Sequence, residues 1–121
     1  MLHLVFCLRR LPDLTREDFQ RYWHGTHAPL VRANAAALGI RRYVQAHTVD
    51  HPVAEAAQAG RGAPEPYDGV AELWFDADEL LARMQTAEGI TASATLLEDE
   101  RRFIDLEHSP IFFAEDKQII P

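Results

Sequence analysis

The sequence has little of what several classes of protein require. Cys7 is the only cysteine among 121 residues, so no disulfide can form within the chain and the composition fits a reducing compartment. Acidic residues outnumber lysine and arginine by 19 to 12, and no basic run occurs, which argues against nucleic-acid binding. No apolar run approaches the roughly 20 residues that a membrane span needs, and the N-terminus lacks the features of a signal peptide. We therefore expect a cytoplasmic protein with neither a nucleic-acid nor a membrane partner.

Motifs that bind cofactors or metals are also missing. The chain has no glycine-rich dinucleotide or phosphate loop, no HExxH, no paired cysteines and no nucleophile elbow. We therefore expect no cofactor and no metal. Any chemistry would then depend on acid/base side chains and on the reactivity of the substrate itself.

The residues that are present predict one domain over residues 1–121, because 47% are hydrophobic and can form a single core. Apolar or alternating segments predict strands over residues 2–9, 40–48, 67–75 and 111–115, the last continuing toward 119–120. Helical periodicity predicts a kinked helix capped by Thr15 and ending at Gly39, and a short helix over 53–59. A helix follows Asp76 to about Gln85, and after an interruption at Gly89 another runs from 91 to 107.

The order of these elements, βαββαβ, predicts an α+β ferredoxin-like fold. In this fold the four strands form an antiparallel sheet and both helices pack on one face. The other face would expose a large apolar patch, which a soluble monomer seldom carries. We therefore expect a homodimer formed by sheet-to-sheet packing, most simply a two-fold symmetric pair.

One segment, Phe19–Val31, concentrates residues that a simple packing helix does not need. It places Trp23 and two histidines beside Gly25 and Pro29. His27 is the strongest candidate for acid/base work, because an irregular backbone here would aim its ring at the sheet and imidazole titrates near neutral pH. The alternative is a structural histidine that bonds a backbone carbonyl freed by the kink.

The spacing of His24 and His27 raises a second hypothesis. Histidines three positions apart can seat two ligands of a metal on one helix face. No third ligand shows convincing spacing, although His47 or Glu72 would have to complete such a set. We therefore favour a metal-free site and place His24 on the surface.

Alternation along residues 40–48 puts Tyr43, Gln45 and His47 on one face of a strand. A polar row of this kind typically faces a cavity, and the alternative is a polar face that meets water. His47 is the second acid/base candidate. Glu72 lies between apolar neighbours, which suits either a buried general base or a partner for an arginine on an adjacent strand.

Aromatic residues supply the other candidates. Trp23 and Trp74 would either line an aromatic pocket or belong to the core. Together with Tyr43, Gln45 and Glu72 they form our predicted substrate-binding set, and His27 and His47 are the predicted catalytic residues.

Several segments together resemble the EthD-domain family of the dimeric α/β-barrel superfamily. They are Tyr22–Trp23, His27–Val31, Tyr43–His47, Asp68–Phe75 and Ser109–Glu115. The resemblance covers most of the chain and implies a ferredoxin-like protomer that dimerises and takes small hydrophobic or aromatic substrates. Family members are linked to degradation of ethyl tert-butyl ether, and relatives act as cofactor-free cyclases, isomerases, decarboxylases and monooxygenases. His24 stands where the family pattern leads us to expect a charged or longer polar residue.

The sequence therefore predicts a cofactor-independent enzyme that acts by acid/base chemistry on a small hydrophobic or aromatic compound. The reaction would be of the oxidoreductase, isomerase, cyclase or decarboxylase type, in a degradative pathway for foreign compounds. A non-catalytic ligand-binding accessory protein of such a pathway is the alternative. A structural dimer module with a filled core is a third hypothesis.

Overall fold

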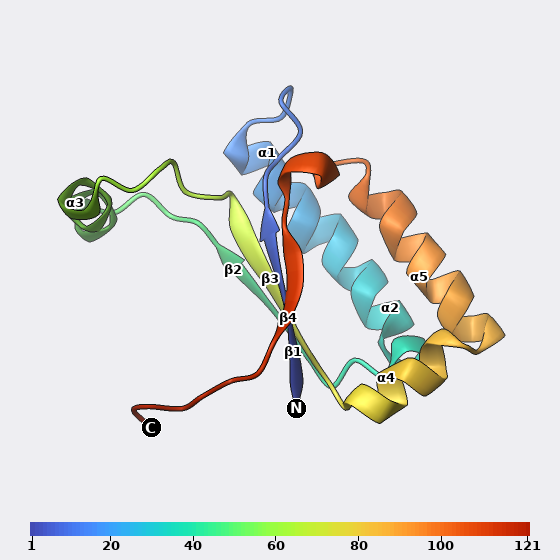
Figure 1. Ribbon diagram of the computed structural model, residues 1–121. Helices are drawn as coiled ribbons and strands as arrows, with labels where there is room; N and C mark the ends of the chain where they lie inside the picture. The colour runs from blue at the N-terminus through green and yellow to red at the C-terminus, as the bar shows by residue number, and fades with distance from the viewer.

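Four antiparallel strands form one sheet in the order β2-β3-β1-β4 (Figure 1). The computed structural model describes residues 1–121. The strands are β1 Leu2–Leu8, β2 Arg42–His47, β3 Gly69–Phe75 and β4 Ile111–Ala114. This arrangement confirms the predicted ferredoxin-like α+β fold.

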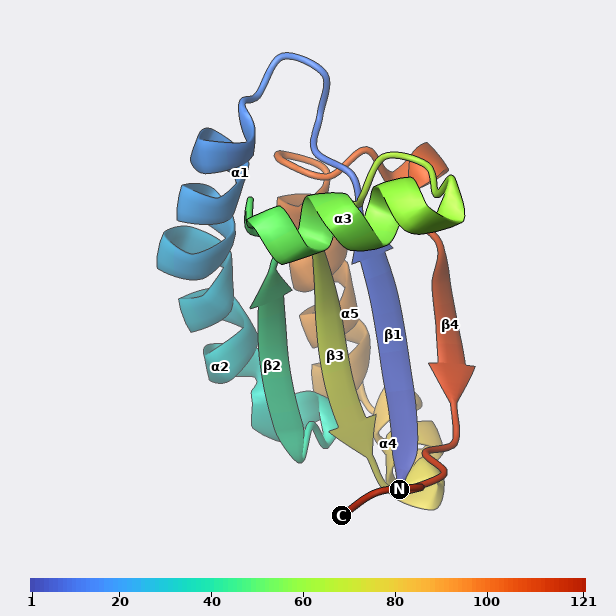
Figure 2. The same cartoon turned by 90° about the vertical axis from the view of Figure 1, so that its left-hand side faces the viewer.

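One face of the sheet is covered by helices from both halves of the chain (Figures 1 and 2). The first half contributes α1 Arg16–Tyr22, a π-helix η1 over Trp23–His27, and α2 Ala28–Leu38. The second half contributes α4 Ala77–Met84 and α5 Ala87–Glu100. Helix α3, Pro52–Arg61, lies on the other side near one end of the strands and buries none of its residues.

The predicted start of the first helix is confirmed, since the Thr15 hydroxyl accepts a hydrogen bond from the Asp18 amide at 3.0 Å. The predicted interruption at Gly89 is wrong. Gly89 lies in the first turn of α5, where a Cβ would stand only 1.8 Å from the Arg83 carbonyl oxygen. The glycine is needed because the ends of α4 and α5 pass so close together, and it does not break the helix.

The C-terminal part of the chain also differs from the prediction. Helix α5 ends at Glu100, well before residue 107, and Ile104 then forms a β-bridge with Arg10. A 3₁₀ turn over Leu106–His108 leads into β4. That strand stops at Ala114, and residues 115–121 form a tail without regular structure.

The core lies between the sheet and the helices. Its larger cluster consists of Phe6, Leu8, Phe19, Trp23, Ala71, Phe103 and Ile104. A smaller cluster between α2 and α5 consists of Val31, Leu38, Ala92 and Leu96. Register explains the sheet contribution, because Phe6 pairs with Ala71 and both therefore face the helices.

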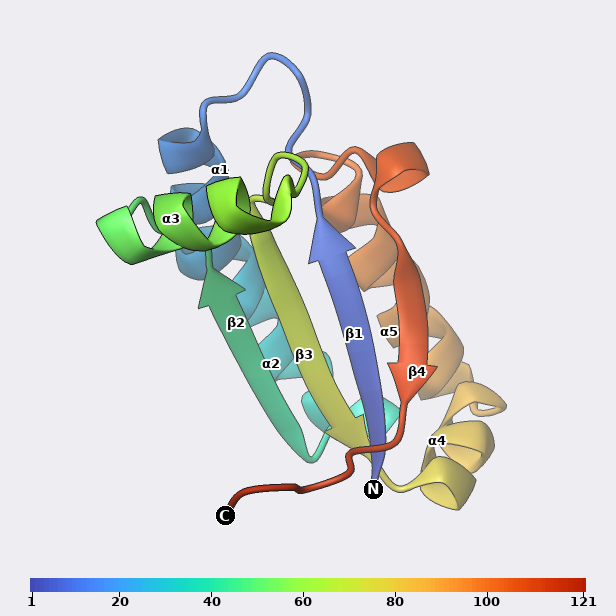
Figure 3. The same ribbon diagram turned by 60° about the vertical axis from the view of Figure 1, so that its left-hand side comes forward.

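The opposite face of the sheet carries alternate residues of the same strands and no covering helix layer (Figures 2 and 3). Val5 pairs with Glu72 and with Phe112, whose side chain is 49% exposed. At one end of this face the C-terminal tail turns back over β1 and β3, where Asp116 bonds both His3 and Trp74. We call this surface the open face.

Candidate active site

The π-helix η1 determines which residues of the first helix face the sheet. The Ala28 amide donates to the Trp23 carbonyl, five residues back, so the predicted kink takes the form of one widened turn within a continuous helix. This turn buries both Trp23, 1% exposed, and His27, 5% exposed, while the residues between them stay on the surface. Single π-turns of this kind often occur at functional sites.

His27 pairs with a carboxylate on a helix from the second half of the chain. Its Nδ1 lies 2.7 Å from Oδ2 of Asp99 on α5, and both side chains are less than a tenth exposed. The Tyr22 hydroxyl donates to the second Asp99 oxygen at 2.6 Å. The structure therefore shows a carboxylate as the partner of His27, and not the backbone carbonyl of our alternative.

Burial and charge fix the protonation of this pair. Burial lowers the pKa of His27 below its ordinary value of 6.5, and the opposing effect of Asp99 does not cancel it. Burial by itself raises the pKa of Asp99, but hydrogen bonds from Tyr22 and His27 outweigh it and leave that pKa lowered. At neutral pH a neutral imidazole therefore donates its Nδ1 hydrogen to an ionised carboxylate. The Nε2 lone pair remains, and no protein group is hydrogen-bonded to it.

His27 lines a cavity of about 60 Å³ between the sheet and helices α2 and α5. Apolar residues make up most of the wall, and the other polar groups are Tyr43 and Glu100. Burial, followed by the charge of Asp99, raises the pKa of Glu100 to about 7. Burial also raises the pKa of Tyr43, which stays protonated at neutral pH. The cavity thus brings a free base, a carboxyl group that titrates near neutrality and a hydroxyl donor together.

The predicted polar row on β2 lies on the helix-facing side and forms a hydrogen-bonded chain. The Gln45 amide nitrogen donates to the Trp23 carbonyl at 2.9 Å and to the Tyr43 hydroxyl at 2.8 Å. Its carbonyl oxygen must then accept from Nε2–H of His47, 2.8 Å away. Because the Tyr43 oxygen accepts from Gln45, its own hydrogen is free for another acceptor.

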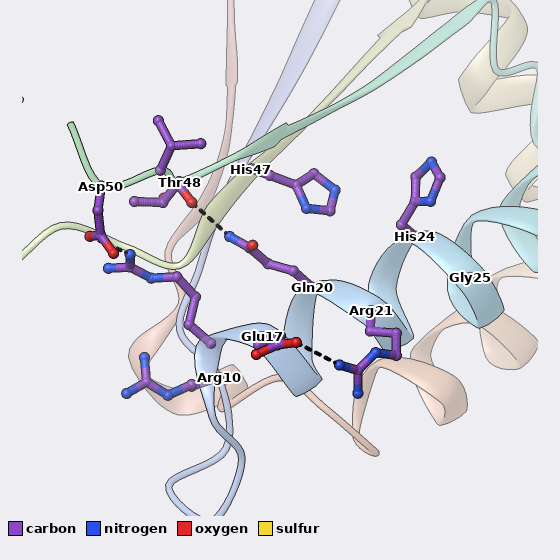
Figure 4. A pocket seen from close by; sticks show the side chains of 11 residues that line it. Arg10, Glu17, Gln20, Arg21, His24, Gly25, His47, Thr48 and Asp50 are labelled. Atoms are coloured by element: carbon purple, nitrogen blue, oxygen red, sulfur yellow. Dashed lines mark hydrogen bonds and ion pairs between the residues drawn. The ribbon is translucent and has the colours of Figure 1, made fainter.

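His47 does not share the cavity with His27. Its ring stacks on Trp23 with centroids 4.4 Å apart, and it lines an open groove between α1 and the segment after β2 (Figure 4). Burial first, and the charge of nearby His24 second, lower the pKa of His47. Of our two predicted catalytic histidines, the structure therefore places one in the cavity and one in the groove, on either side of Trp23.

Glu72 and Trp74 lie on the open face, away from His27. The Trp74 ring stacks on His3 at 4.2 Å between centroids, and the Arg42 guanidinium lies 4.5 Å from the Trp74 ring centre. Glu72 is paired, but with His3 Nε2 at 3.1 Å in place of the arginine that we considered. The sheet separates these two predicted binding residues from the cavity.

Tyr22, Asp99 and Glu100 belong to the site and were absent from our predicted set. The charged run Glu98–Arg102 is typical of a solvated helix face, which conceals them. One signal could have identified Asp99. It shares the helical spacing of the buried residues Ala92, Leu96 and Phe103, so periodicity alone places a carboxylate on an apolar stripe.

Two global findings complete the description. The structure groups no three side chains of His, Cys, Asp or Glu in positions to hold a metal ion. None of its helices has both the length and the apolar character needed to cross a membrane.

The fold and the site together define a ferredoxin-like domain with a buried histidine–aspartate pair beside a small apolar cavity. The EthD domain model matches residues 11–107, so the chain belongs to the EthD domain family. No curated protein gives a significant sequence match.

Solved structures show the same fold at low sequence identity. An EthD family protein from Bacillus halodurans superposes with a TM-score of 0.60 and 20% identity, over 97% of this chain and 100% of that chain. SnoaB, a cofactor-independent oxygenase from Streptomyces nogalater, gives 0.54 and 15%, over 99% and 96%. A dimeric ferredoxin-like protein of unknown function from Bacteroides fragilis gives 0.57 and 9%, over 95% of each chain.

Proposed function

We propose that the protein is a cofactor-independent enzyme that removes or returns a proton on a small hydrophobic or aromatic compound, with His27 as the general base. The observation that carries this proposal is the neutral, buried His27, bonded through Nδ1 to Asp99 and left with a free Nε2 beside an apolar cavity. A histidine held in one tautomer by a carboxylate is suited to accept a proton at Nε2.

The other polar groups of the cavity have complementary roles in this proposal. When Nε2 takes a proton from carbon or oxygen, negative charge develops on the substrate, and the Tyr43 hydroxyl can donate a hydrogen bond to it. Glu100, with a pKa of about 7, supplies a proton when neutral and accepts one when ionised. The apolar wall keeps water away and strengthens both interactions.

The reaction type follows from what the resulting anion does next. Protonation at another atom gives isomerisation, attack on an internal carbonyl gives cyclisation, and direct reaction with dioxygen gives oxygenation. The likeness to SnoaB supports the last type, since that protein is a cofactor-independent oxygenase. We place the enzyme in the cytoplasm, in a pathway that degrades foreign compounds.

The test compares turnover of compounds that co-purify with the protein, identified by mass spectrometry. His27→Asn keeps a nitrogen donor near the Nδ1 position and removes only the Nε2 base. We expect it to reduce the rate by about 10²–10⁴-fold while ligand affinity stays within a few-fold. His51→Asn is the matched control, because His51 is exposed and caps α3, a role that asparagine fills well. Equal turnover in wild type and His27→Asn would refute the proposal.

A non-catalytic ligand-binding role is the second candidate, and the apolar lining of the cavity favours it. In that case the co-purifying compound would be recovered unchanged after incubation with the wild-type protein. His27→Asn would then alter its affinity alone.

A further inference from the structure

The cavity beside His27 is too small for the compounds that the proposed function requires. Its volume of about 60 Å³ has room for a few water molecules. Sites for small organic ligands usually measure roughly 300–1,000 Å³. A substrate that reaches His27 must therefore also occupy neighbouring space.

Two stacked side chains separate the cavity from a much larger hollow. The Trp23 indole lines the cavity and stacks on His47, which lines the groove. The groove is an open surface hollow of about 1210 Å³ along α1 and the segment after β2 (Figure 4). The Trp23–His47 stack is therefore the point where the two spaces adjoin.

The groove gathers three arginines and two histidines, although the whole chain carries a net charge of −7. Two carboxylates, Glu17 and Asp50, also line it, and the buried Asp68 neutralises Arg10. Both carboxylates are held in exposed pairs, Glu17 with Arg21 and Asp50 with Arg16, and such pairs contribute little and exchange readily.

Arg16 is an arginine of the groove whose carboxylate partner is exposed to solvent. Its Nη1 donates to Asp50 at 2.9 Å, and the Asp50 side chain is 90% exposed. A ligand carboxylate can take the place of Asp50 on the Nη groups, whereas the buried Nε, 3.8 Å from Asp68, is out of reach of the groove.

Two histidines add further free nitrogens. His24 and His47 stand side by side in the groove, with ring centroids 6.0 Å apart. Nε2 of His47 is hydrogen-bonded to Gln45, so its Nδ1 is the nitrogen available to a ligand. His24 makes no hydrogen bond with the protein. The charge of His24 contributes to the lowered pKa of His47, so an anion bound between the two rings would favour the charged form of His47.

We propose that this groove binds an aromatic carboxylate, with the carboxylate on Arg16 and the histidine pair and the ring against the Trp23–His47 stack. The inference rests on the proposed function and names its substrate class. Arg16 and the two histidines select the negative charge, and the side of the His47 ring that faces the groove selects a planar ring. A ring bound there lies across the Trp23–His47 stack from His27.

The binding test uses benzoate, with benzamide as a neutral isostere and acetate as an anion without a ring. NMR titration should show benzoate shifting the ring signals of His24 and His47 and raising the pKa of His47. We expect benzamide and acetate to bind at least about tenfold more weakly, since benzamide lacks the charge that the arginine recognises and acetate lacks the ring. Equal binding of benzamide would refute recognition of the charge. Equal binding of acetate would refute recognition of the ring, and absence of benzoate binding would refute both.

Arg16→Gln tests the carboxylate contact and should weaken benzoate binding by about tenfold or more. Arg32→Gln is the matched control, because Arg32 is exposed on α2 and lies outside the groove. If Arg16→Gln does not fold, His24→Gln replaces it, since His24 is exposed and bonds no protein group. Unchanged affinity in the folded variant would overturn the proposal.

His27→Asn separates this inference from the proposed function. The groove does not include His27, so the variant should bind benzoate as the wild type does. Loss of turnover in His27→Asn without any benzoate binding by the wild type would leave the base assignment intact and refute the groove. Benzoate binding by the wild type together with normal turnover in His27→Asn would refute the base assignment and leave the groove intact.

Discussion

At the scale of residues, the chemistry of this protein depends on partners that lie far apart along the chain. His27 and Asp99 are 72 positions apart, on different helices, and they meet inside the core. The sequence marks His27 through its glycine and proline neighbours, whereas Asp99 lies in a charged run that hides it. The local sequence can therefore mark a candidate base, whereas the carboxylate that orients it depends on tertiary packing.

Asp99→Asn should lower the pKa of His27 further, because the carboxylate is the group that opposes the effect of burial. We also expect a loss of about 1–3 kcal/mol in the free energy of unfolding, since charge-assisted hydrogen bonds become neutral ones. NMR titration of the His27 ring and urea denaturation measure the two effects. The exposed Asp13→Asn serves as the control, and an unchanged or higher pKa in Asp99→Asn would contradict the assigned pairing.

Glu100 makes stability fall as pH rises. Its pKa is about 7 in the folded protein against an ordinary value of 4.5. The group's contribution is therefore fully present below pH 4.5 and lost as the pH rises through 7. Glu100→Gln removes this dependence. Between pH 5 and pH 8 we therefore expect the free energy of unfolding of the variant to rise by on the order of 2 kcal/mol relative to that of wild type.

Urea denaturation at the two pH values measures this gain. Glu98→Gln changes an exposed carboxylate on the same helix and should show no such gain. A parallel pH dependence in wild type and Glu100→Gln would show that Glu100 ionises normally.

At the scale of elements, the approach of η1 to β3 determines where Trp23 lies. A Cβ on Gly69 would stand 2.4 Å from Cζ3 of Trp23 and 2.9 Å from the Ala46 carbonyl oxygen. Gly69→Ala should therefore displace the indole and cost about 1–3 kcal/mol, the usual effect of overpacking a core. Thermal unfolding measures the loss, and Trp23 fluorescence in a Trp74→Phe background reports the displacement.

Gly60→Ala is the matched control for this experiment. Gly60 lies in α3 with no atom near the position of a Cβ, so alanine should be neutral or slightly stabilising there. A Gly69→Ala protein as stable as wild type, with unchanged fluorescence, would contradict the packing of η1 on β3.

The elements also show where sequence reasoning succeeds and where it stops. Period-two and helical patterns predicted all four strands and the helices that cover one face of the sheet, because burial of one side of each element imposes those periods directly. The π-turn was predicted only as a kink, since glycine and proline mark an irregularity without specifying its hydrogen bonds. The predicted break at Gly89 is wrong because the close packing of this glycine against Arg83 is a tertiary contact that leaves no local signal in the sequence.

At the scale of the whole molecule, the open face is the surface through which we expect two copies of the chain to pair. Its centre is formed by Val5 on β1, which pairs with Glu72 on β3 and with Phe112 on β4, and no helix layer covers it. Phe112 is 49% exposed there, exposed apolar patches often mark interfaces, and a ferredoxin-like protein of the same fold is dimeric. Packing of two such faces about a two-fold axis would bury the apolar residues of both copies and leave the groove and the His27 cavity on the helix side of each protomer.

Light scattering at micromolar concentration should therefore give about twice the chain mass of 13.7 kDa. Val5→Lys places a charge at the centre of the open face, beside Glu72, where sheet packing would require both charged groups to lose their water. We expect that variant to be monomeric, or to dissociate at a concentration at least about a hundredfold higher than wild type. Ile90→Lys, an equally large change at a side chain 59% exposed on α5, should leave the mass unchanged. A monomeric wild type would refute the dimer. A dimer that Val5→Lys leaves intact while Ile90→Lys dissociates it would place the interface elsewhere, because burial of the open face predicts the opposite effects of the two lysines.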